Sequence, residues 1–301
     1  MSKPGFLLTF FFMKKTIITI VSALQLLMAG CSHTEHKTDN GRLNTERIVC
    51  VSKQLNEIIF AIGAGSHVVG TDLTSVFPEE IKKLPKVGYH RLLNAEGIIS
   101  LKPTLVIHDG NVAPATALTQ LEKVGIPVKE FSEAKTVDDT KKLIRELGAL
   151  FHVEKGADSV CNKLDADLRK ADEQKKQYKT TPKVILVHFG QQSNQYLVVG
   201  KGSAATQMIA LAGGENTASV DKGMGPLSPE IIAKAQPDVV LATEVGYDQK
   251  GSVENFKGLA GIALTPAGKN NRIFRIEENN IIYFGPRTGE NILKIMELIH
   301  K

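Results

Sequence analysis

The segment NAEGIISLKPTLVI at residues 94–107 aligns with SPEIIAKAQPDVVL at residues 228–241, and this internal repeat decides the fold class. Each copy begins with a residue type that caps helix N-termini, Asn94 in one and Ser228 in the other, and has a glutamate two positions later. A proline then ends the helix, and an apolar run typical of a buried strand follows it. Two distant copies of one helix–strand unit predict two similar α/β lobes.

Short apolar runs rich in β-branched residues extend this pattern on both sides of the repeat. They fall at residues 47–52, 67–71, 104–108, 127–131, 183–189, 196–199, 238–242 and 272–276. Several are apolar at consecutive positions, as expected of strands that are covered on both faces of a parallel sheet. Helical spacing recurs between them, with Ser52 as a candidate N-cap of the stripe Leu55, Ile58, Ile59 and Ile62. The alternation predicts an α/β fold with two lobes built on mainly parallel sheets.

A long stretch between the lobes has no strand signal and no proline, from residue 137 to residue 179. Leucines and valine at helical spacing predict one or two helices there. We expect residues 153–181 to form a long connecting helix between an N-terminal lobe, 45–152, and a C-terminal lobe, 182–301. The charged residues between 163 and 179 are interpreted as a solvated face of that helix.

The first thirty residues have the layout of a secretory signal. Lys14 and Lys15 precede an apolar run, which is shorter than the roughly 20 residues that a bilayer-spanning helix needs. Because these lysines also separate the run from an earlier apolar stretch, Met13 is an alternative start to Met1. We therefore expect an exported protein.

The end of this signal resembles the lipobox of bacterial lipoproteins, since residues 27–31 read LMAGC. The resemblance implies that residues 1–30 are a signal peptide and that Cys31 carries the lipid. Residues 31–44 then form a polar, lipid-anchored tether without periodicity. The protein would be held at a bacterial membrane, on its periplasmic or cell-surface side.

The composition narrows the function classes. Of 301 residues, 42% are hydrophobic and 23% charged, which rules out wholesale disorder, and three cysteines are too few for a disulfide-stapled fold. We expect Cys50 and Cys161 to be buried free thiols, with a single bridge between them left open. Three of the lysines behind the net charge of +5 lie in the first thirty residues, so the nearly neutral remainder argues against nucleic acid as a partner. No catalytic motif stands out, and we expect no enzyme.

Taken together, these features resemble the substrate-binding proteins of ABC importers, of the rigid-hinge class that carries cobalamin, ferric siderophores and haem. The resemblance covers about residues 45–300 and includes, besides the two half-repeats, residues 47–57, 68–72, 77–78 and 213–216. It implies that the ligand cleft lies between the two lobes. It also implies that the partners are the cargo and an ABC permease dimer with its ATPase.

Within that class, LPKVGYHRLLNAEGI at residues 84–98 resembles the periplasmic haem-binding proteins, in which a Gly-Tyr-x-Arg stretch precedes an Ala-Glu-Gly helix. FGPR at residues 284–287 also resembles that group. The resemblance implies that haem b (hemin) is the transported ligand, that Tyr89 is the axial ligand of its iron, and that Arg91 is a neighbouring cation. Ferric iron prefers an anionic oxygen, and tyrosinate is an established axial ligand. Arg91 or Arg287 could instead pair with a haem propionate.

A second axial ligand stays open in the sequence. Some haem-binding relatives use a histidine of the C-terminal lobe, and His188, at the end of a predicted strand, is the nearest candidate. A strand-end histidine held in the core is an equally good interpretation of His188. His90 adjoins Tyr89, and His108 ends another predicted strand, so each is a further candidate.

The two repeated glutamates, Glu96 and Glu230, have a different implied role. In this class, one surface glutamate of each lobe docks onto arginines of the membrane permease. Both also lie where a carboxylate favours the positive N-terminus of a helix, so the helix dipole alone could explain them. The alternatives for the whole protein are a ferric siderophore or cobalamin carrier on the same fold, a zinc or manganese binder, and an exported enzyme.

Overall fold

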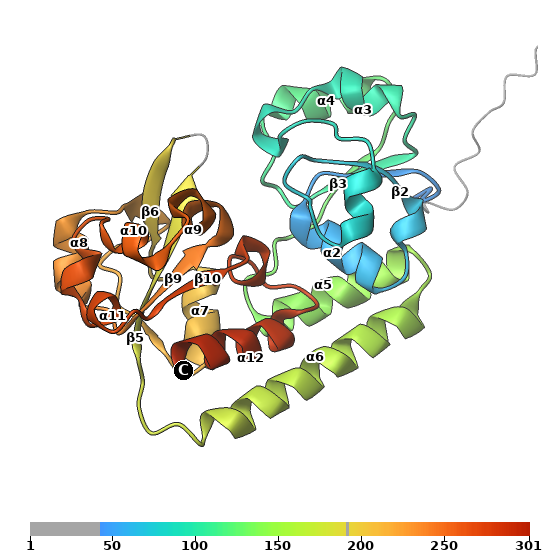
Figure 1. The fold of residues 1–301 in the computed structure, drawn as a ribbon. Helices are drawn as coiled ribbons and strands as arrows, with labels where there is room; N and C mark the ends of the chain where they lie inside the picture. Colours follow the sequence, from blue (N-terminus) through green and yellow to red (C-terminus); the bar gives the residue numbers. More distant parts are fainter. Residues whose placement is uncertain (1–42, 191–192) are drawn as a thin grey trace, which may run out of the picture. The chain divides into compact units, whose positions relative to one another are not determined.

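The computed structural model describes residues 43–190 and 193–301, whose strands form two separate sheets (Figure 1). The predicted signal peptide, the lipidated Cys31 and nearly all of the tether lie outside these residues. The first sheet is wholly parallel and has the order β2-β1-β3-β4. Its strands are β1 (Ile48–Cys50), β2 (Val68–Thr71), β3 (Leu105–His108) and β4 (Val128–Glu130). The four strands predicted for the N-terminal lobe are thereby confirmed.

Both faces of the first sheet are covered, which explains why its strands are apolar at consecutive positions. Ile48 and Cys50 face a core that includes Leu55 of α2 and residues of α5 and α6. Val49 faces the opposite core, together with Ile98 of α3 and residues of α4. The helices are α2 (Lys53–Ala61), α3 (Ala95–Ser100), α4 (Ala115–Lys123), α5 (Val137–Leu150) and α6 (Glu154–Lys175).

The second sheet has the order β10-β9-β5-β6-β8, with β7 paired to β5. Its strands are β5 (Lys183–Gly190), β6 (Gln195–Val199), β7 (Glu215–Asn216), β8 (Met224–Pro226), β9 (Val239–Thr243) and β10 (Ile273–Ile276). The four strands predicted for this half are confirmed, whereas the short β7 and β8 had no apolar run to reveal them. β6 pairs antiparallel with β5, and β8 with β6, so this sheet is only partly parallel. A short connection allows an antiparallel hairpin, while parallel pairing needs a longer crossover.

Alternate residues of β5 point to opposite cores, so this sheet is also covered on both faces. Val184 lies in one core with Met208 of α7 and Ile292 of α12. Ile185 lies in the other core with Phe256 of α10. The remaining helices are α7 (Ala204–Leu211), α8 (Pro229–Ala235), α9 (Glu244–Lys250), α10 (Val253–Lys257), α11 (Pro266–Lys269) and α12 (Thr288–Ile299).

The internal repeat has the same backbone course in both halves. Asn94 and Ser228 cap α3 and α8 through their side-chain oxygens, as predicted. Each helix then ends on a non-glycine residue in the left-handed region, Lys102 with φ 48° and Gln236 with φ 39°, one position before the proline. Since such residues are uncommon outside glycine, their occurrence at equivalent positions supports two related lobes.

Two helices occupy the stretch expected to connect the lobes, and the second is the long one. The 22 residues of α6 extend for about 33 Å at 1.5 Å per residue. Ala157 and Cys161 of α6 belong to a core of the first lobe, whereas Ala171 belongs to a core of the second. α6 therefore packs along α5 and α12 and adds side chains to both cores (Figure 1). Cys50 and Cys161 are free and buried, as expected.

Side chains of α2 also bond directly to the second lobe. The Gln54 amide nitrogen donates to the carbonyl oxygen of Phe284 at 2.7 Å. Lys53 forms an ion pair with Glu278 at 3.1 Å. These bonds join the start of α2 to the chain around residues 278–285. Among the described helices, none is long and apolar enough to cross a membrane.

Candidate ligand-binding site

Tyr89 lies in a loop whose backbone is bonded to the end of β2. Val87 N donates to Thr71 O at 2.9 Å, and Leu73 N donates to Gly88 O at 2.9 Å. Gly88 has φ +107°, a conformation that side chains rarely adopt, so the residue before Tyr89 needs to be glycine. The backbone conformation at position 88 therefore explains why a glycine precedes Tyr89.

The Tyr89 side chain is half-buried, and its hydroxyl makes no hydrogen bond to any residue that the structure describes. Its carbonyl oxygen accepts from Leu92 N at 2.8 Å, which begins a short 3₁₀ turn, His90–Leu92. The next residue, Leu93, is buried and donates to Ala113 O at 2.8 Å. The loop thus fixes the tyrosine backbone and leaves the phenol oxygen free to meet a ligand.

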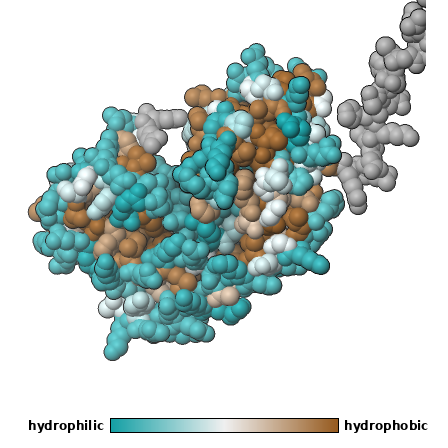
Figure 2. Space-filling model, turned by 45° about the vertical axis from the view of Figure 1, so that its right-hand side comes forward, coloured by the Kyte–Doolittle hydropathy of each residue, from teal (hydrophilic) through white to brown (hydrophobic). Residues whose placement is uncertain are grey.

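Two exposed leucines are joined to the tyrosine loop by backbone hydrogen bonds. Leu73, bonded through its backbone to Gly88, is 54% exposed, and Leu92, bonded to Tyr89, is 73% exposed. Val76 and Phe77 on the same lobe are also exposed. Figure 2 shows that apolar side chains reach the surface of the first lobe in several places. A group of exposed apolar residues marks a surface that binds an apolar ligand or partner.

Arg91 is exposed and directs its guanidinium toward the loop after β3. Nε and Nη2 donate to the Asn111 side-chain oxygen at 3.1 and 2.9 Å. Asn111 is neutral, and Arg91 forms no ion pair among the described residues. Among the described residues its positive charge is therefore unpaired, and it can bind an anion two positions after Tyr89.

A buried carboxylate lies behind the tyrosine loop. Asp72 is fully buried at the end of β2 and accepts hydrogen bonds from Thr74 and Ser75. Its Oδ2 lies 3.6 Å from His90 Nδ1, and the His90 ring packs on the Tyr89 ring with 4.5 Å between centroids. Burial alone would raise the pKa of Asp72, but the nearby His90 and the hydrogen bonds from Ser75 and Thr74 outweigh burial and lower it. Asp72 is a residue that the sequence analysis missed.

His188 and His108 are held by local polar contacts. His188 Nδ1 lies 3.4 Å from both Glu278 Oε2 and Thr243 Oγ1. His108 is buried, and its Nδ1 accepts from Gly110 N at 3.0 Å. Burial lowers the pKa of both imidazoles, against the opposing effect of nearby carboxylates, so neutral rings are favoured. Neither histidine has a contact that links it directly to Tyr89.

Arg287 is engaged in a bridge between the lobes. Its Nε and Nη2 donate to the two carboxylate oxygens of Glu57 at 2.9 and 3.1 Å, and the guanidinium lies 3.7 Å from the centre of the Phe77 ring. Tyr283 donates to the same carboxylate at 2.6 Å. The bidentate pair uses the face of Arg287 that a haem propionate would need. Glu57 and Tyr283 had no spacing signal, because their contact joins residues far apart in the chain.

Glu96 and Glu230 are both exposed in the first turns of α3 and α8. The capping oxygens of Asn94 and Ser228 bond backbone N–H groups of the same turns. Each carboxylate therefore projects from a helix start that is fixed to its lobe. The exposure fits both a docking role and a favourable interaction with the helix dipole.

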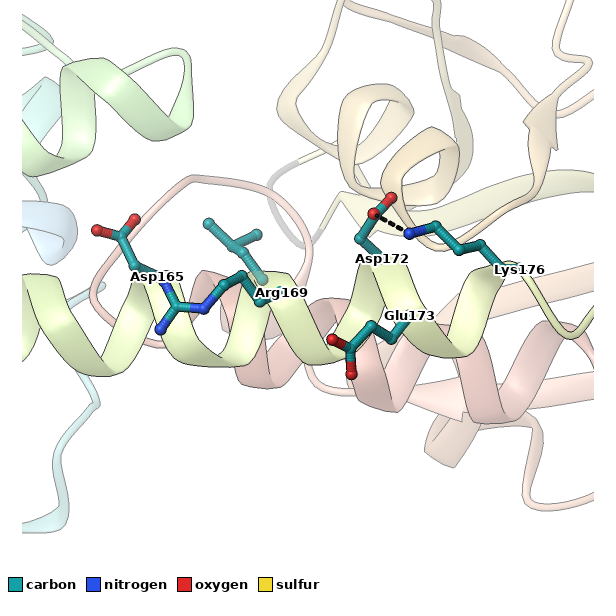
Figure 3. Close-up of a pocket in the computed structure, with 6 residues that line it drawn as sticks. Asp165, Arg169, Asp172, Glu173 and Lys176 are labelled. Carbon is teal, nitrogen blue, oxygen red and sulfur yellow. Dashed lines mark ion pairs between the residues drawn. The ribbon is translucent and has the colours of Figure 1, made fainter.

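One surface depression lacks the character of a ligand site. A depression of about 350 Å³ on α6 is lined by one helix and mostly by charged residues, among them Asp165, Arg169 and Glu173 (Figure 3). Lys176 and Asp172, largely exposed, form an ion pair there at 3.1 Å. This matches the expected solvated face. Within the described residues, no group of three or more His, Cys, Asp or Glu side chains could hold a bare metal ion.

The chain matches the periplasmic binding protein family over residues 48–279. It is 30% identical over 258 residues to the ABC transporter substrate-binding lipoprotein YvrC of Bacillus subtilis, covering 85% of this chain and 80% of that protein. It is 28% identical over 202 residues to the vitamin B12-binding protein of Pectobacterium atrosepticum, covering 65% and 71%. The chain therefore belongs to the periplasmic binding protein family, as the sequence resemblance predicted.

Solved structures of haem-binding proteins share its fold. The periplasmic heme-binding protein RhuT of Roseiflexus sp. RS-1, in apo form, is 33% identical with a TM-score of 0.79, covering 85% of this chain and 98% of RhuT. The periplasmic heme-binding protein BhuT, in complex with two hemes, is 30% identical with a TM-score of 0.78 and the same coverage. The two-lobed α/β fold is thereby confirmed as that of a substrate-binding transport protein.

Proposed function

We propose that this protein captures haem on the outer side of a bacterial membrane and delivers it to an ABC permease. One observation carries the choice of cargo: Tyr89 is half-buried and its hydroxyl has no hydrogen bond among the described residues, while its loop is bonded through the backbone to the exposed Leu73 and contains the exposed Leu92 and Arg91. A haem has apolar faces, an iron that takes a phenolate, and two carboxylates. The solved haem-binding proteins of the same fold support this proposal.

The chemistry assigns each residue a role. Tyr89 supplies the anionic oxygen that ferric iron prefers. A free phenol is neutral near pH 7, so it is the bond to the ferric iron that would favour its anion. Leu73 and Leu92 would pack on the porphyrin. His188 is a candidate second ligand from the other lobe, because its contacts with Glu278 and Thr243 use Nδ1 and leave Nε2 for the iron.

For Arg287 we favour a structural role over the propionate contact expected from the sequence. Its guanidinium already holds the buried Glu57 carboxylate through two bonds. Moving it to a propionate would leave that carboxylate without its cation, which is costly in a buried position. Arg91 is the better candidate for the propionate, because its only described partner is a neutral amide.

The cargo can be tested by titrating the purified apo-protein with hemin, cyanocobalamin and a ferric siderophore in parallel. We expect hemin to give a stoichiometric Soret shift with a phenolate-to-iron charge-transfer band, and the other two compounds to bind at least about 100-fold more weakly. Equal or tighter binding of either competitor would refute haem as the cargo.

Cobalamin is the second candidate, favoured by the similarity to vitamin B12-binding proteins over 65% of the chain. The two cargoes differ in whether they need the Tyr89 oxygen as a metal ligand. Haem has an open axial position that the phenolate fills, whereas a cobalamin that enters with its cobalt already ligated needs no such oxygen. Tight cobalamin binding that is insensitive to loss of the Tyr89 hydroxyl would support this second candidate.

We infer that Glu96 and Glu230 dock the two lobes onto the permease. With both glutamates replaced by alanine, haem binding by the purified protein should be unchanged, while haem-dependent growth on iron-poor medium should fall at least about tenfold. The matched control is Glu122→Ala, an exposed glutamate of α4. A double variant that supports growth like the wild type would contradict the docking role.

The anchor belongs to the same proposal. The lipobox at residues 27–31 and the similarity to a lipoprotein of Bacillus subtilis both support lipidation of Cys31. The lipid would hold the carrier close to its permease, and residues 31–44 would act as the tether. The protein would then work on the periplasmic or cell-surface side of the membrane.

A further inference from the structure

A chain of contacts leads from the buried end of β2 to the ring of Tyr89. Asp72 is fully buried, and its carboxylate is oriented by Thr74 N, which donates to Oδ2 at 2.8 Å, and by the hydroxyls of Thr74 and Ser75. Asn56 of α2 donates to Ser75 Oγ at 2.9 Å and so ties this group to the core of the lobe. The carboxylate therefore has a fixed position.

His90 connects this fixed carboxylate to the tyrosine. Its Nδ1 lies 3.6 Å from Asp72 Oδ2 and 3.5 Å from Thr74 Oγ1, and its side chain is 14% exposed. The His90 ring also packs on the Tyr89 ring, with 4.5 Å between the ring centroids and an angle of 55° between the ring planes. Neighbouring side chains in a loop usually diverge, so this packing of residues 89 and 90 needs an explanation.

We propose that His90, held by Asp72, is a positioning residue that directs the Tyr89 phenol toward the haem iron. This inference rests on the proposed function and adds a residue pair to it. Metal ligands in proteins are oriented by partners outside the coordination sphere, and loss of such a partner typically costs about 10–100-fold in affinity. Tyr89 has no hydrogen bond that could orient its ring among the described residues, so ring packing has to do it.

A double-mutant cycle between positions 89 and 90 tests the link. His90→Ala should lower hemin affinity at least about tenfold and weaken the charge-transfer band. In the Tyr89→Phe background, which keeps the ring and removes the ligand oxygen, His90→Ala should have almost no further effect. Equal losses in both backgrounds would overturn the proposal, because His90 would then act on haem or on the fold and not through Tyr89.

A second variant tests the role of Asp72. His90→Phe keeps an aromatic ring against Tyr89 and removes the nitrogen that faces the carboxylate. We expect the variant to retain part of the packing on Tyr89. Its affinity for hemin should still fall at least about threefold and its charge-transfer band should shift, because Asp72 no longer holds the ring at position 90. Wild-type affinity and spectrum in His90→Phe would refute the part assigned to Asp72.

His67→Ala is the matched control. His67 is also half-buried, packs on an aromatic ring, Phe151, and has its Nδ1 held at 2.8 Å from Thr45 O, but it has no contact with the tyrosine loop. It should bind hemin like the wild type. If Tyr89→Phe itself keeps the wild-type affinity and spectrum, the proposed function fails. If Tyr89→Phe loses them and His90→Ala does not, only the present inference fails.

Discussion

Tyr89→Phe should lower the affinity for hemin by about 100-fold or more, which corresponds to about 2.7 kcal/mol. The substitution removes one oxygen and keeps the ring, so packing against His90 is preserved. Only the bond between the phenolate and ferric iron is lost, along with the charge-transfer band that reports it. Spectrophotometric titration and the rate of haem loss to an excess of a competing acceptor measure both effects.

The control for this prediction is Tyr178→Phe. Tyr178 is 40% exposed and stacks on His300, so it loses a hydroxyl in a comparably accessible position without any relation to the loop of Tyr89. It should bind hemin like the wild type. An unchanged affinity and visible spectrum in Tyr89→Phe would contradict the assignment of the iron ligand, and the choice of cargo with it.

Glu57→Ala should destabilise the apo-protein by about 3–5 kcal/mol, the cost of leaving one member of a buried ion pair without its partner. Glu57 is 2% exposed, and the side chain of its partner Arg287 is 19% exposed. Tyr283 also loses its acceptor. Burial and the Glu57 charge raise the pKa of Tyr283 well above its usual value, so it is a protonated donor to this carboxylate. Urea unfolding followed by circular dichroism measures the loss.

Two further variants show whether the loss comes from the ion pair. Glu290→Ala breaks a pair with Lys294 in which both side chains are more than 40% exposed, and it should cost less than about 1 kcal/mol. Glu57→Leu combined with Arg287→Met replaces both charges by apolar groups and should recover part of the stability. A loss in Glu57→Ala no larger than that in Glu290→Ala would show that the bridge contributes little.

This bridge bears on how the carrier works. Glu57 and Gln54 lie on α2 in the first lobe, and their partners Arg287, Tyr283 and the Phe284 carbonyl lie in the second. The long α6 contributes to cores in both lobes as well. Direct bonds and a shared helix resist relative movement of the lobes, so we expect haem binding with little change in their arrangement.

The secondary structure was largely predictable because its causes are local. The apolar runs marked eight strands at their correct places, and Ser52, Asn94 and Ser228 were identified as helix caps from their residue type and position. The short β7 and β8 escaped, since two or three residues are too few to show a periodicity. The antiparallel pairing of β6 also escaped, because a strand pattern does not encode the direction of its neighbour.

In the candidate site, too, the features with local causes were predictable and those that depend on distant residues were not. Tyr89 and Arg91 were identified from a family resemblance in a contiguous stretch, and the structure adds what lies around them. Asp72 and His90 meet across a gap of eighteen positions, and Glu57 meets Arg287 across 230. Arg287 shows the consequence: the family resemblance of residues 284–287 suggested a ligand contact, but Glu57, from the other end of the chain, already binds its guanidinium.

The sequence by itself determined the two-lobed α/β class, the repeat that builds both lobes and the stretch that contains the tyrosine, because helix caps, strand patterns and contiguous motifs are short-range properties. Only the tertiary structure decided which cation is free and which is paired, and that a buried carboxylate lies behind His90. Those are properties of distance in space and of exclusion from water, and both arise when remote parts of the chain fold together.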